Sequence, residues 1–275
     1  MTDFFSDSSI KKINLALSGG GMAGMYHGGV CKHLLEMYRR KKLDIIHVYG
    51  TSAGAFVGAF FIYHMVNPNA NVDDFLNTFH TVFKNECKMG NFRILPVWRK
   101  LCDMILPDDI HVSCSGKLHV AVMMKDQRGI RQKVISQYNS KNELIDILSM
   151  SGFIPLLTGL SPCATYICPV TKYSYPVVDG IFTPPIENTQ YETLYINLNK
   201  HRYPLIKRLF YFEKPMNNLI EEGYKNSNDF FYHKKEIPTL YLYEQGYNKK
   251  HKKYLYLWTN KLLWLLIYTW FTIIT

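Results

Sequence analysis

Apolar residues recur in two patterns along the first part of the chain. Residues 11–17 alternate polar and apolar positions and then become apolar, which predicts a strand that enters a buried sheet. A glycine-rich turn follows, and apolar positions at helical spacing predict a helix that runs to about Tyr38. An apolar strand from residue 44 then leads into residues 53–66, which are apolar all round. These 14 residues are too few for a membrane span of about 20, so we expect a buried central helix.

The later residues continue this order of helices and strands. Ser140 and Glu143 form a capping box that predicts the start of a helix running through Ser149. Further helices are predicted at 73–87, at 92–106 and within 200–235, and further strands at 118–124, 132–138, 175–178, 193–198 and 239–243. The predicted fold class is α/β.

The chain is moderately basic, with 32 Lys and Arg against 22 Asp and Glu and a net charge of +10. Part of this charge lies in residues 249–253, directly before the apolar residues 254–275. A basic run beside apolar sequence favours an anionic membrane surface, and we expect no nucleic acid as a partner. The alternative is that the run is a solvated linker.

Six cysteines are scattered without any C-x-x-C pair, and residues 1–9 have no basic region followed by a long apolar stretch. The second feature argues against a secretory signal. Together they favour reduced thiols and a cytosolic catalytic domain that is not secreted.

Residues 50–54 read Gly-Thr-Ser-Ala-Gly and lie between the second predicted strand and its helix. A G-x-S-x-G turn in this setting is typical of a nucleophile elbow, which exposes its serine at the end of a strand. Gly50 and Gly54 would permit the sharp turn, and the helix from Ala53 would direct its N-terminal N–H groups toward Ser52. The alternative is a tight turn in which Ser52 caps the helix.

The glycine-rich turn at Gly19, Gly20, Gly21 and Gly24 has three interpretations. It matches the G-x-G-x-x-G pattern of dinucleotide-binding loops, it lacks the Gly-Lys-Ser/Thr ending of a P-loop, and it could direct backbone N–H groups at an oxyanion. The next strand ends in the serine turn, where a dinucleotide fold needs an acidic residue. We therefore expect donor loop and serine side by side, as an acyl-transfer site.

Asp179 is the best-placed candidate to accept the proton of Ser52, because it ends an apolar strand and precedes a glycine. A carboxylate can act as the base without an imidazole, although an Asp-Gly pair is also common in turns. A Ser-His-Asp triad would need a histidine after the acid. His201, His233 and His251 follow Asp179, but the residues around them do not indicate a catalytic role. His47, which precedes the serine turn, is expected to be a core residue.

The three motifs occur in the order found in the patatin-like phospholipases, which this chain resembles from about Ile13 to Pro185. Residues 115–120, 140–145 and 151–155 are similar to the animal branch that includes adiponutrin and adipose triglyceride lipase. The resemblance implies an α/β, three-layer fold with a central, mostly parallel sheet flanked by helices. Ile181 stands where the family usually has glycine or alanine after Asp-Gly.

The resemblance also implies a Ser52–Asp179 dyad that hydrolyses carboxylic esters of phospholipids or acylglycerols. Ser52 would attack the ester, Asp179 would serve as base, and N–H groups around Gly20, Gly21 and Ala53 would bind the oxyanion. No metal or organic cofactor is implied. The domain would cover residues 1–199, followed by a peripheral helical and strand extension over 200–253.

Residues 254–275 complete the predicted organisation as a membrane-associated C-terminal segment. The stretch 262–274 has no charge but is shorter than a span, and its flanking tryptophans and tyrosines suit the headgroup region. We expect it to hold the protein on the cytoplasmic face of a membrane or on a lipid-droplet surface. The alternative is a helix packed on the domain.

Three other functions stay open from the sequence. A transacylase would use the same dyad, a lipid-binding pseudoenzyme would keep the fold without turnover, and a nucleotide-binding protein would use the glycine loop. Intact Ser52 and Asp179 argue against the pseudoenzyme.

Overall fold

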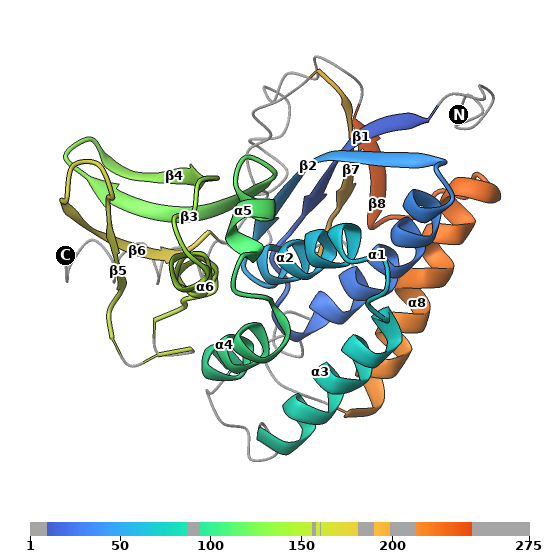
Figure 1. Ribbon diagram of the computed structural model, residues 1–275, viewed down its shortest axis with the longest axis horizontal. Helices are drawn as coiled ribbons and strands as arrows, with labels where there is room; N and C mark the ends of the chain where they lie inside the picture. The colour runs from blue at the N-terminus through green and yellow to red at the C-terminus, as the bar shows by residue number, and fades with distance from the viewer. Residues whose placement is uncertain are drawn as a thin grey trace.

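The computed structural model describes residues 10–86, 94–155, 158–159, 161–180, 190–198 and 213–243. Helices and strands follow one another in the predicted alternation (Figure 1). The strands are β1 (Lys11–Leu17), β2 (Leu43–Thr51), β3 (Leu118–Asp126), β4 (Gly129–Ile135), β5 (Ala164–Ile167), β6 (Ser174–Asp179), β7 (Glu192–Ile196) and β8 (Leu240–Tyr243). The helices are α1 (Gly24–Arg39), α2 (Ala53–Val66), α3 (Val72–Glu86), α4 (Ile94–Ile105), α5 (Ile110–Cys114), α6 (Lys141–Ser151) and α8 (Glu213–Tyr232).

The strands form one sheet in the order β5-β6-β3-β2-β1-β7-β8, and β4 pairs with β3 outside this path. Its centre is parallel, because β1 pairs in parallel with β2 and β7, and β2 with β3. Antiparallel pairs extend it on both sides, with β4, β6 and β5 beyond β3 and with β8 beyond β7. The predicted α/β class with a parallel sheet core is confirmed.

Strands β2 and β6 end against the same edge of β3. Thr51 at the end of β2 pairs with Ala121, and Asp179 at the end of β6 pairs with Val122. β4 pairs with β3 over both positions and therefore occupies the opposite edge. The carboxyl ends of β2 and β6 thus meet head to head along β3.

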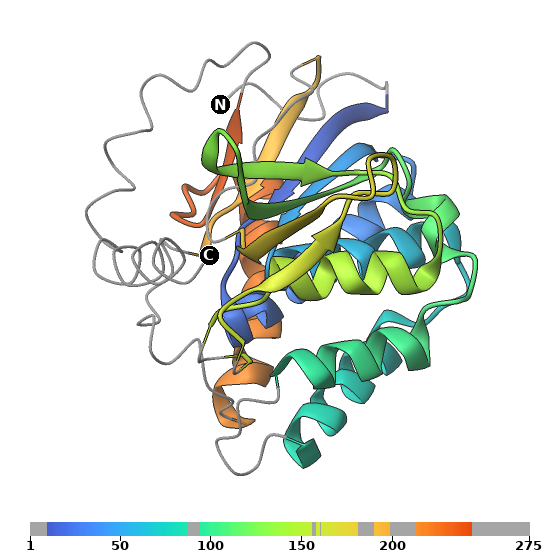
Figure 2. The same ribbon diagram turned by 90° about the vertical axis from the view of Figure 1, so that its left-hand side faces the viewer.

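One face of the sheet is covered by helices. Alternate side chains of β1, such as Ile13, Leu15 and Leu17, belong to a large apolar cluster that includes residues of α1, α2 and α6. Figure 2 shows these helices along that side of the sheet. The intervening positions point to the opposite face, where Ala16, Tyr49 and Tyr195 form a second buried cluster.

Most predicted elements are confirmed, and two of them, 11–17 and 53–66, have the bounds expected. The sequence predicts the fourth strand at 132–138, and this placement is wrong by three residues. Gly129, with φ 100°, closes the hairpin directly after Arg128, so β4 begins there. Tyr138 lies outside the strand, and its hydroxyl donates to the carbonyl oxygens of Leu118 and Ile135.

Helix α8 lies within the segment predicted to be helical and packs closely against α1. A Cβ atom on Gly29 of α1 would collide with the carbonyl of Ile220, and one on Gly223 of α8 would lie 3.1 Å from the amide of Val30. Strand β8 then extends the sheet beside β7. In the described part of the chain, no helix is both long and apolar enough to cross a bilayer. Residues 254–275 lie outside the described residues.

Candidate active site

Ser52 occupies the sharp turn between β2 and α2, as the G-x-S-x-G pattern predicts. Its backbone has φ 54° and ψ −129°. A side chain with positive φ in this region costs on the order of 1–3 kcal/mol, so the surrounding structure must hold it. Ser52 is half-buried, and its side chain makes no capping hydrogen bond to α2. The alternative that Ser52 caps the helix therefore has no support in the geometry.

The two glycines of the turn allow a close approach that no side chain would tolerate. A Cβ atom on Gly50 would lie 2.5 Å from the Cα of Ala55. A Cβ atom on Gly54 would collide with the carbonyl of Leu17 and lie 2.7 Å from the carbonyl oxygen of Ser18. The turn is therefore pressed against its own helix and against the end of β1, which keeps the strained backbone in place.

The glycine-rich loop follows β1 and lies against this turn. Gly21 has φ 55° and opens a short 3-10 turn over Gly21–Ala23, after which α1 begins at Gly24. A Cβ atom on Gly24 would lie 2.9 Å from the Cβ of Ala53. The predicted juxtaposition of the glycine loop and the serine turn is thus present, at the carboxyl ends of two adjacent parallel strands.

His27 on α1 supports the base of this loop, a role that sequence reasoning did not assign. Its Nε2 donates to the carbonyl oxygen of Ser18 at 2.8 Å, because a carbonyl can only accept. The Ser18 hydroxyl donates to the Gly19 carbonyl at 3.1 Å and accepts from the amide of Leu198 at 2.9 Å. The loop is therefore tied both to α1 and to the residues that follow β7.

Asp179 is 3% exposed and lies at the end of β6. Its amide donates to the carbonyl of Phe153 at 2.7 Å, and the amide of Gly180 donates to the carbonyl of Ser151 at 3.3 Å. A Cβ atom on Gly180 would lie 2.9 Å from the Cγ2 of Thr51. The structure therefore brings the Asp-Gly pair directly against the last residue before Ser52.

Ser151 and Gly152, at the end of α6, connect the two halves of this site. The amide of Ser52 donates to the Ser151 hydroxyl at 2.9 Å, and that hydroxyl donates to the carbonyl of Ala121 at 2.7 Å. A Cβ atom on Gly152 would lie 3.8 Å from the Ser52 hydroxyl oxygen and 3.0 Å from Leu95. Sequence reasoning missed both residues, although the glycine after the predicted helix marks where that helix ends.

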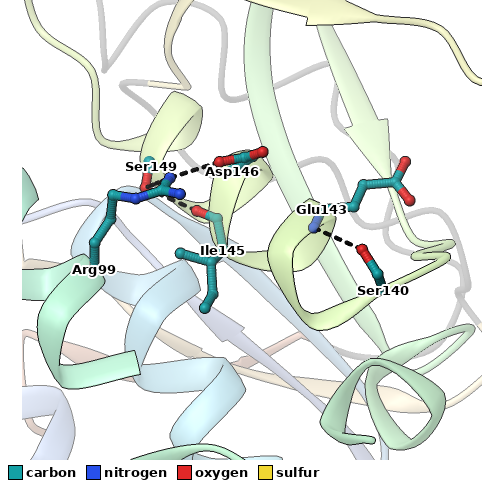
Figure 3. Close-up of polar contacts among 6 residues, drawn as sticks. All are labelled: Arg99, Ser140, Glu143, Ile145, Asp146 and Ser149. Atoms are coloured by element: carbon teal, nitrogen blue, oxygen red, sulfur yellow. Dashed lines mark hydrogen bonds and ion pairs between the residues drawn. The ribbon is translucent and has the colours of Figure 1, made fainter. Parts of the chain in front are cut away.

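Helix α6 is fixed at its beginning and near its end (Figure 3). The predicted cap at Ser140 is confirmed, since its hydroxyl accepts from the amide of Glu143 at 3.1 Å. The Glu143 carboxylate accepts from the amide of Asn139, one residue before the cap, at 2.7 Å. Arg99 of α4 donates to Asp146 at 2.6 Å and to the Ser149 hydroxyl at 3.3 Å. Both ends of the helix that presents Ser151 are therefore anchored.

The described histidines considered as bases have contacts elsewhere. Nδ1 of His47 shares a hydrogen bond with Nε2 of His119 at 3.2 Å. The ring of His119 stacks on the ring of Tyr49, on the face of the sheet opposite the helices. Burial, and then the neighbouring His47, lower the pKa of His119 to about 4. His233 lies after α8, where its amide donates to the Asp229 carbonyl at 3.1 Å. His201 and His251 lie outside the described residues.

Comparison with known proteins identifies the class to which this architecture belongs. The family model "Patatin-like phospholipase" matches residues 15–189, which include the glycine loop, the serine turn and Asp179. The chain therefore belongs to the patatin-like phospholipase family, as the resemblance of its motifs predicted.

Individual relatives include two human proteins. The chain is 31% identical over 159 residues to patatin-like phospholipase domain-containing protein 2, covering 55% of this chain and 30% of that protein. It is 30% identical over 178 residues to omega-hydroxyceramide transacylase, covering 62% and 30%. It is also 28% identical to the mouse 1-acylglycerol-3-phosphate O-acyltransferase Pnpla3, covering 55% and 37%. The matched region thus spans about a third of the length of these relatives.

Among solved structures, VipD from Legionella pneumophila aligns with a TM-score of 0.32 and 14% identity, over 64% of this chain and 47% of that one. The family assignment comes from the sequence matches.

Proposed function

We propose that this protein is a lipid acyl hydrolase that uses Ser52 as nucleophile and Asp179 as base. The observation that carries the proposal is the meeting of β2 and β6 on one edge of β3. In support, the strained serine turn approaches both the Asp-Gly pair at the end of β6 and the glycine loop closely. The substrates would be carboxylic esters of phospholipids or acylglycerols, the class implied by the family.

The chemistry would proceed in two acyl-transfer steps. The Ser52 oxygen attacks the ester carbonyl carbon while its proton passes to the Asp179 carboxylate. Backbone N–H groups of Gly20, Gly21 and Ala53 stabilise the oxyanion, with Gly19 and Gly24 shaping the loop. The tetrahedral intermediate expels the alcohol, which takes the proton from Asp179. Water, deprotonated by Asp179, then attacks the acyl-serine ester. The bond between the acyl carbon and the Ser52 oxygen breaks, Ser52 takes the proton back from Asp179, and the fatty acid leaves.

Acyl transfer to an alcohol in place of water is the second candidate, and one observation favours it. Two of the relatives are named for a transacylase and an acyltransferase reaction. The same Ser52 ester would be the intermediate, so the two functions differ in what attacks it. Mass analysis of the products after incubation with a phospholipid, with and without a lysophospholipid acceptor, separates a free fatty acid from a transferred acyl chain.

Membrane or lipid-droplet association completes the proposal. Its support is the sequence of residues 249–275, a basic run followed by an aromatic-rich apolar segment, which suits the cytoplasmic face of a membrane. Truncation after Gly246 is expected to weaken sedimentation with anionic vesicles while leaving soluble-ester hydrolysis intact. If the truncated chain sediments as well as the full-length protein, this segment is not the anchor.

The decisive experiment is labelling and turnover of Ser52→Ala and Asp179→Asn. Each is expected to lower hydrolysis of a soluble short-chain ester by at least about a thousandfold, because the nucleophile or the base is gone. A fluorophosphonate probe should label wild type at Ser52 and should not label Ser52→Ala. Ser227→Ala, at a buried serine on α8 hydrogen-bonded to His33, is the control and should keep wild-type labelling and turnover. If Ser52→Ala hydrolyses the ester at the wild-type rate while remaining folded, the proposed site is wrong. Loss of activity in His233→Ala, with the fold intact, would instead indicate a triad.

A further inference from the structure

The hydrogen bonds around Ser151 point to a role in the reaction that the proposed dyad leaves unassigned. Ser151 is fully buried at the last turn of α6. Its hydroxyl accepts from the amide of the strained Ser52, and its carbonyl accepts from the amide of Gly180. One residue therefore holds the backbone of both halves of the candidate site.

We propose that Ser151 is a positioning residue that holds the Ser52 backbone in its reactive conformation and in register with Asp179. The inference rests on the proposed function, because it presumes that Ser52 is the nucleophile. The Ser151 hydroxyl has one proton, which it donates to the carbonyl of Ala121 at 2.7 Å. Its oxygen is thereby oriented to accept from Ser52, and its bond to β3 fixes its position.

The elements around Ser151 hold it rigidly enough for this task. The cap at Ser140 and the bonds from Arg99 to Asp146 and Ser149 fix α6 from outside the site (Figure 3). Asp179 is linked to the same end of α6, because its amide donates to the carbonyl of Phe153, two residues after the helix. Displacement of this helix end would therefore move Ser52 and Asp179 relative to each other.

Removal of the hydroxyl has a specific consequence. In Ser151→Ala the amide of Ser52 and the carbonyl of Ala121 lose a buried partner, and the positive φ of Ser52 loses a bond that holds it. The backbone can then relax and carry the Ser52 oxygen away from its reactive position. We expect kcat on a soluble ester to fall roughly thirtyfold with KM changed less than about threefold, since the groups that bind substrate remain.

The test separates positioning from folding by active-site labelling. In Ser151→Ala the rate constant for fluorophosphonate labelling should fall in step with kcat, while the final stoichiometry stays that of wild type. A merely structural role would lower the stoichiometry and leave the rate constant unchanged. Ser227→Ala on α8 is the matched control, because Ser227 is also fully buried and its hydroxyl bonds to Nδ1 of His33 at 2.8 Å, not to the serine turn or to α6.

A second set of variants covers the case in which Ser151→Ala does not fold. Ser151→Cys keeps the size of the side chain with a much weaker hydrogen-bonding group, and Ser151→Thr keeps the hydroxyl. The proposal expects slow labelling in the cysteine variant and labelling close to wild type in the threonine variant. Wild-type rates in both the alanine and cysteine variants would overturn it. If Ser52→Ala itself were active, the proposed function would fail instead, so the two failures are distinct.

A separate observation concerns the turn between β5 and β6, residues 168–173. The side chains of Ile167, Val170 and Tyr173 on or beside this turn are 59%, 86% and 69% exposed. Three exposed apolar residues so close together are unusual for a surface turn in contact with water. Lys172 lies between two of them, so the turn is both apolar and cationic.

Cations gather at the same end of the sheet. Antiparallel pairing of β6 with β3 puts this turn at the end where β3 turns into β4, on the left in Figure 1. Residues 125–133 contribute Lys125, Arg128, Arg131 and Lys133. Asp126, which is paired with Arg131, is the carboxylate among them. A surface with exposed apolar side chains and clustered cations is complementary to an anionic bilayer, where apolar groups insert and headgroups attract the cations.

We infer that the β5–β6 turn docks on an anionic lipid surface, independently of residues 249–275. Strand β6 leads from this turn to Asp179, which lies about 17 Å from Ser174 because five residue steps separate them. Docking there would tether the protein to the surface that contains its substrate, with the candidate site at the far end of β6 from the contact. This inference deepens the proposed function, but it is tested by binding alone.

Vesicle sedimentation of the full-length chain carrying Ser52→Ala tests the docking without turnover. Val170→Asp with Tyr173→Asp should weaken binding to phosphatidylcholine vesicles containing phosphatidylserine by roughly tenfold, because charges replace the inserting groups. Val112→Asp on α5 is the matched control, since Val112 is 67% exposed away from this turn. Lys172→Glu with Arg128→Glu should weaken the same binding in a salt-sensitive way.

The inference fails if the double aspartate variant binds as tightly as Val112→Asp, because residues 249–275 would then account for the attachment. It also fails if the charge-reversed variant binds normally, because another protein or a neutral surface would then fit the turn better. Neither outcome bears on the dyad, whose test is the activity of chains with an intact Ser52.

Discussion

Strands β2 and β6 reach the same edge of β3 in different ways. β2 is followed at once by the serine turn and α2, and these three elements are continuous from Leu43 to Val66. β6 carries Asp179 from a distant part of the sequence, and it is placed by bonds from its end to the carbonyls of Ser151 and Phe153. The serine side is therefore built by local chain geometry, and the carboxylate side by long-range contacts.

This difference shows which side of the site is strained and which side can shift in position. The positive φ of Ser52 is held by close backbone contacts at Gly50 and Gly54 and by the bond from its amide to the Ser151 hydroxyl. The end of β6 rests on two amide hydrogen bonds and on pairing with β3, which tolerate small shifts more readily. We therefore expect the serine side to fail by unfolding and the carboxylate side to fail by losing its register.

Gly54→Ala should give the largest loss of stability. The new methyl would meet the carbonyls of Leu17 and Ser18, which are backbone atoms and cannot rotate away. We expect the free energy of unfolding to fall by about 3 kcal/mol, measured by chemical denaturation. Gly58→Ala on the same helix is the control, because its methyl would meet side chains of Leu118 and Val48, and it should cost about 1 kcal/mol. Equal losses would contradict the distinction.

Acid should destabilise the fold through two buried histidines, His64 on α2 and His119 on β3. Burial is the main cause that lowers the pKa of each to about 4. Below the unfolded pKa of roughly 6.5 the unfolded chain binds the proton and the folded chain does not, so stability falls as pH drops from there toward 4.

The expected loss is roughly 2 kcal/mol per histidine at about pH 4.5 relative to neutral pH. Denaturation curves at the two pH values measure it. His64→Leu should remove its share of this dependence without altering that of His119. If His64→Leu keeps the full pH dependence, the pKa of His64 is not lowered in the folded protein.

Gly180→Ala tests the carboxylate side. Its methyl would collide with the carbonyl of Ala121 and lie 2.9 Å from Thr51 Cγ2, so the end of β6 must move. We expect a loss of about 1–2 kcal/mol in the free energy of unfolding, smaller than for Gly54→Ala, together with a fall of roughly a hundredfold in ester turnover. A thermal melt and a turnover assay on the same sample decide it. Normal turnover would mean that the position of Asp179 does not matter.

Arg99→Ala should have the smallest effect. The side chains of Arg99 and Asp146 are 42% and 50% exposed, and ion pairs in such positions contribute roughly 0.5 kcal/mol. The rate of labelling at Ser52 should change less than about threefold, because the cap at Ser140 still holds α6. If the labelling rate of Ser52 falls much more than threefold while the free energy of unfolding changes little, Arg99 also helps to position Ser151.

The serine side could be predicted from sequence because its signals are contiguous. An apolar strand, a G-x-S-x-G turn and an apolar helix give β2, the turn and α2 with little ambiguity. Ser151, Gly152 and His27 could not be found this way, since a serine at a helix end and a histidine on a helix have no distinctive pattern. Their contacts depend on which strands become neighbours. No local sequence pattern predicts that β6 lies end to end with β2.

The pairing of β1 with β7 has a consequence for how the chain is synthesised. Among the described strands β1 is made before the others, and β2 can cover one of its edges soon afterwards. Its other edge pairs with Ile196 and the residues before it, which follow Leu17 by about 180 residues. At roughly 5–20 residues per second, that edge stays open for about 10–40 seconds during translation. An open strand edge can pair with other chains, so a chain emerging from a ribosome depends on protection that the finished molecule no longer needs.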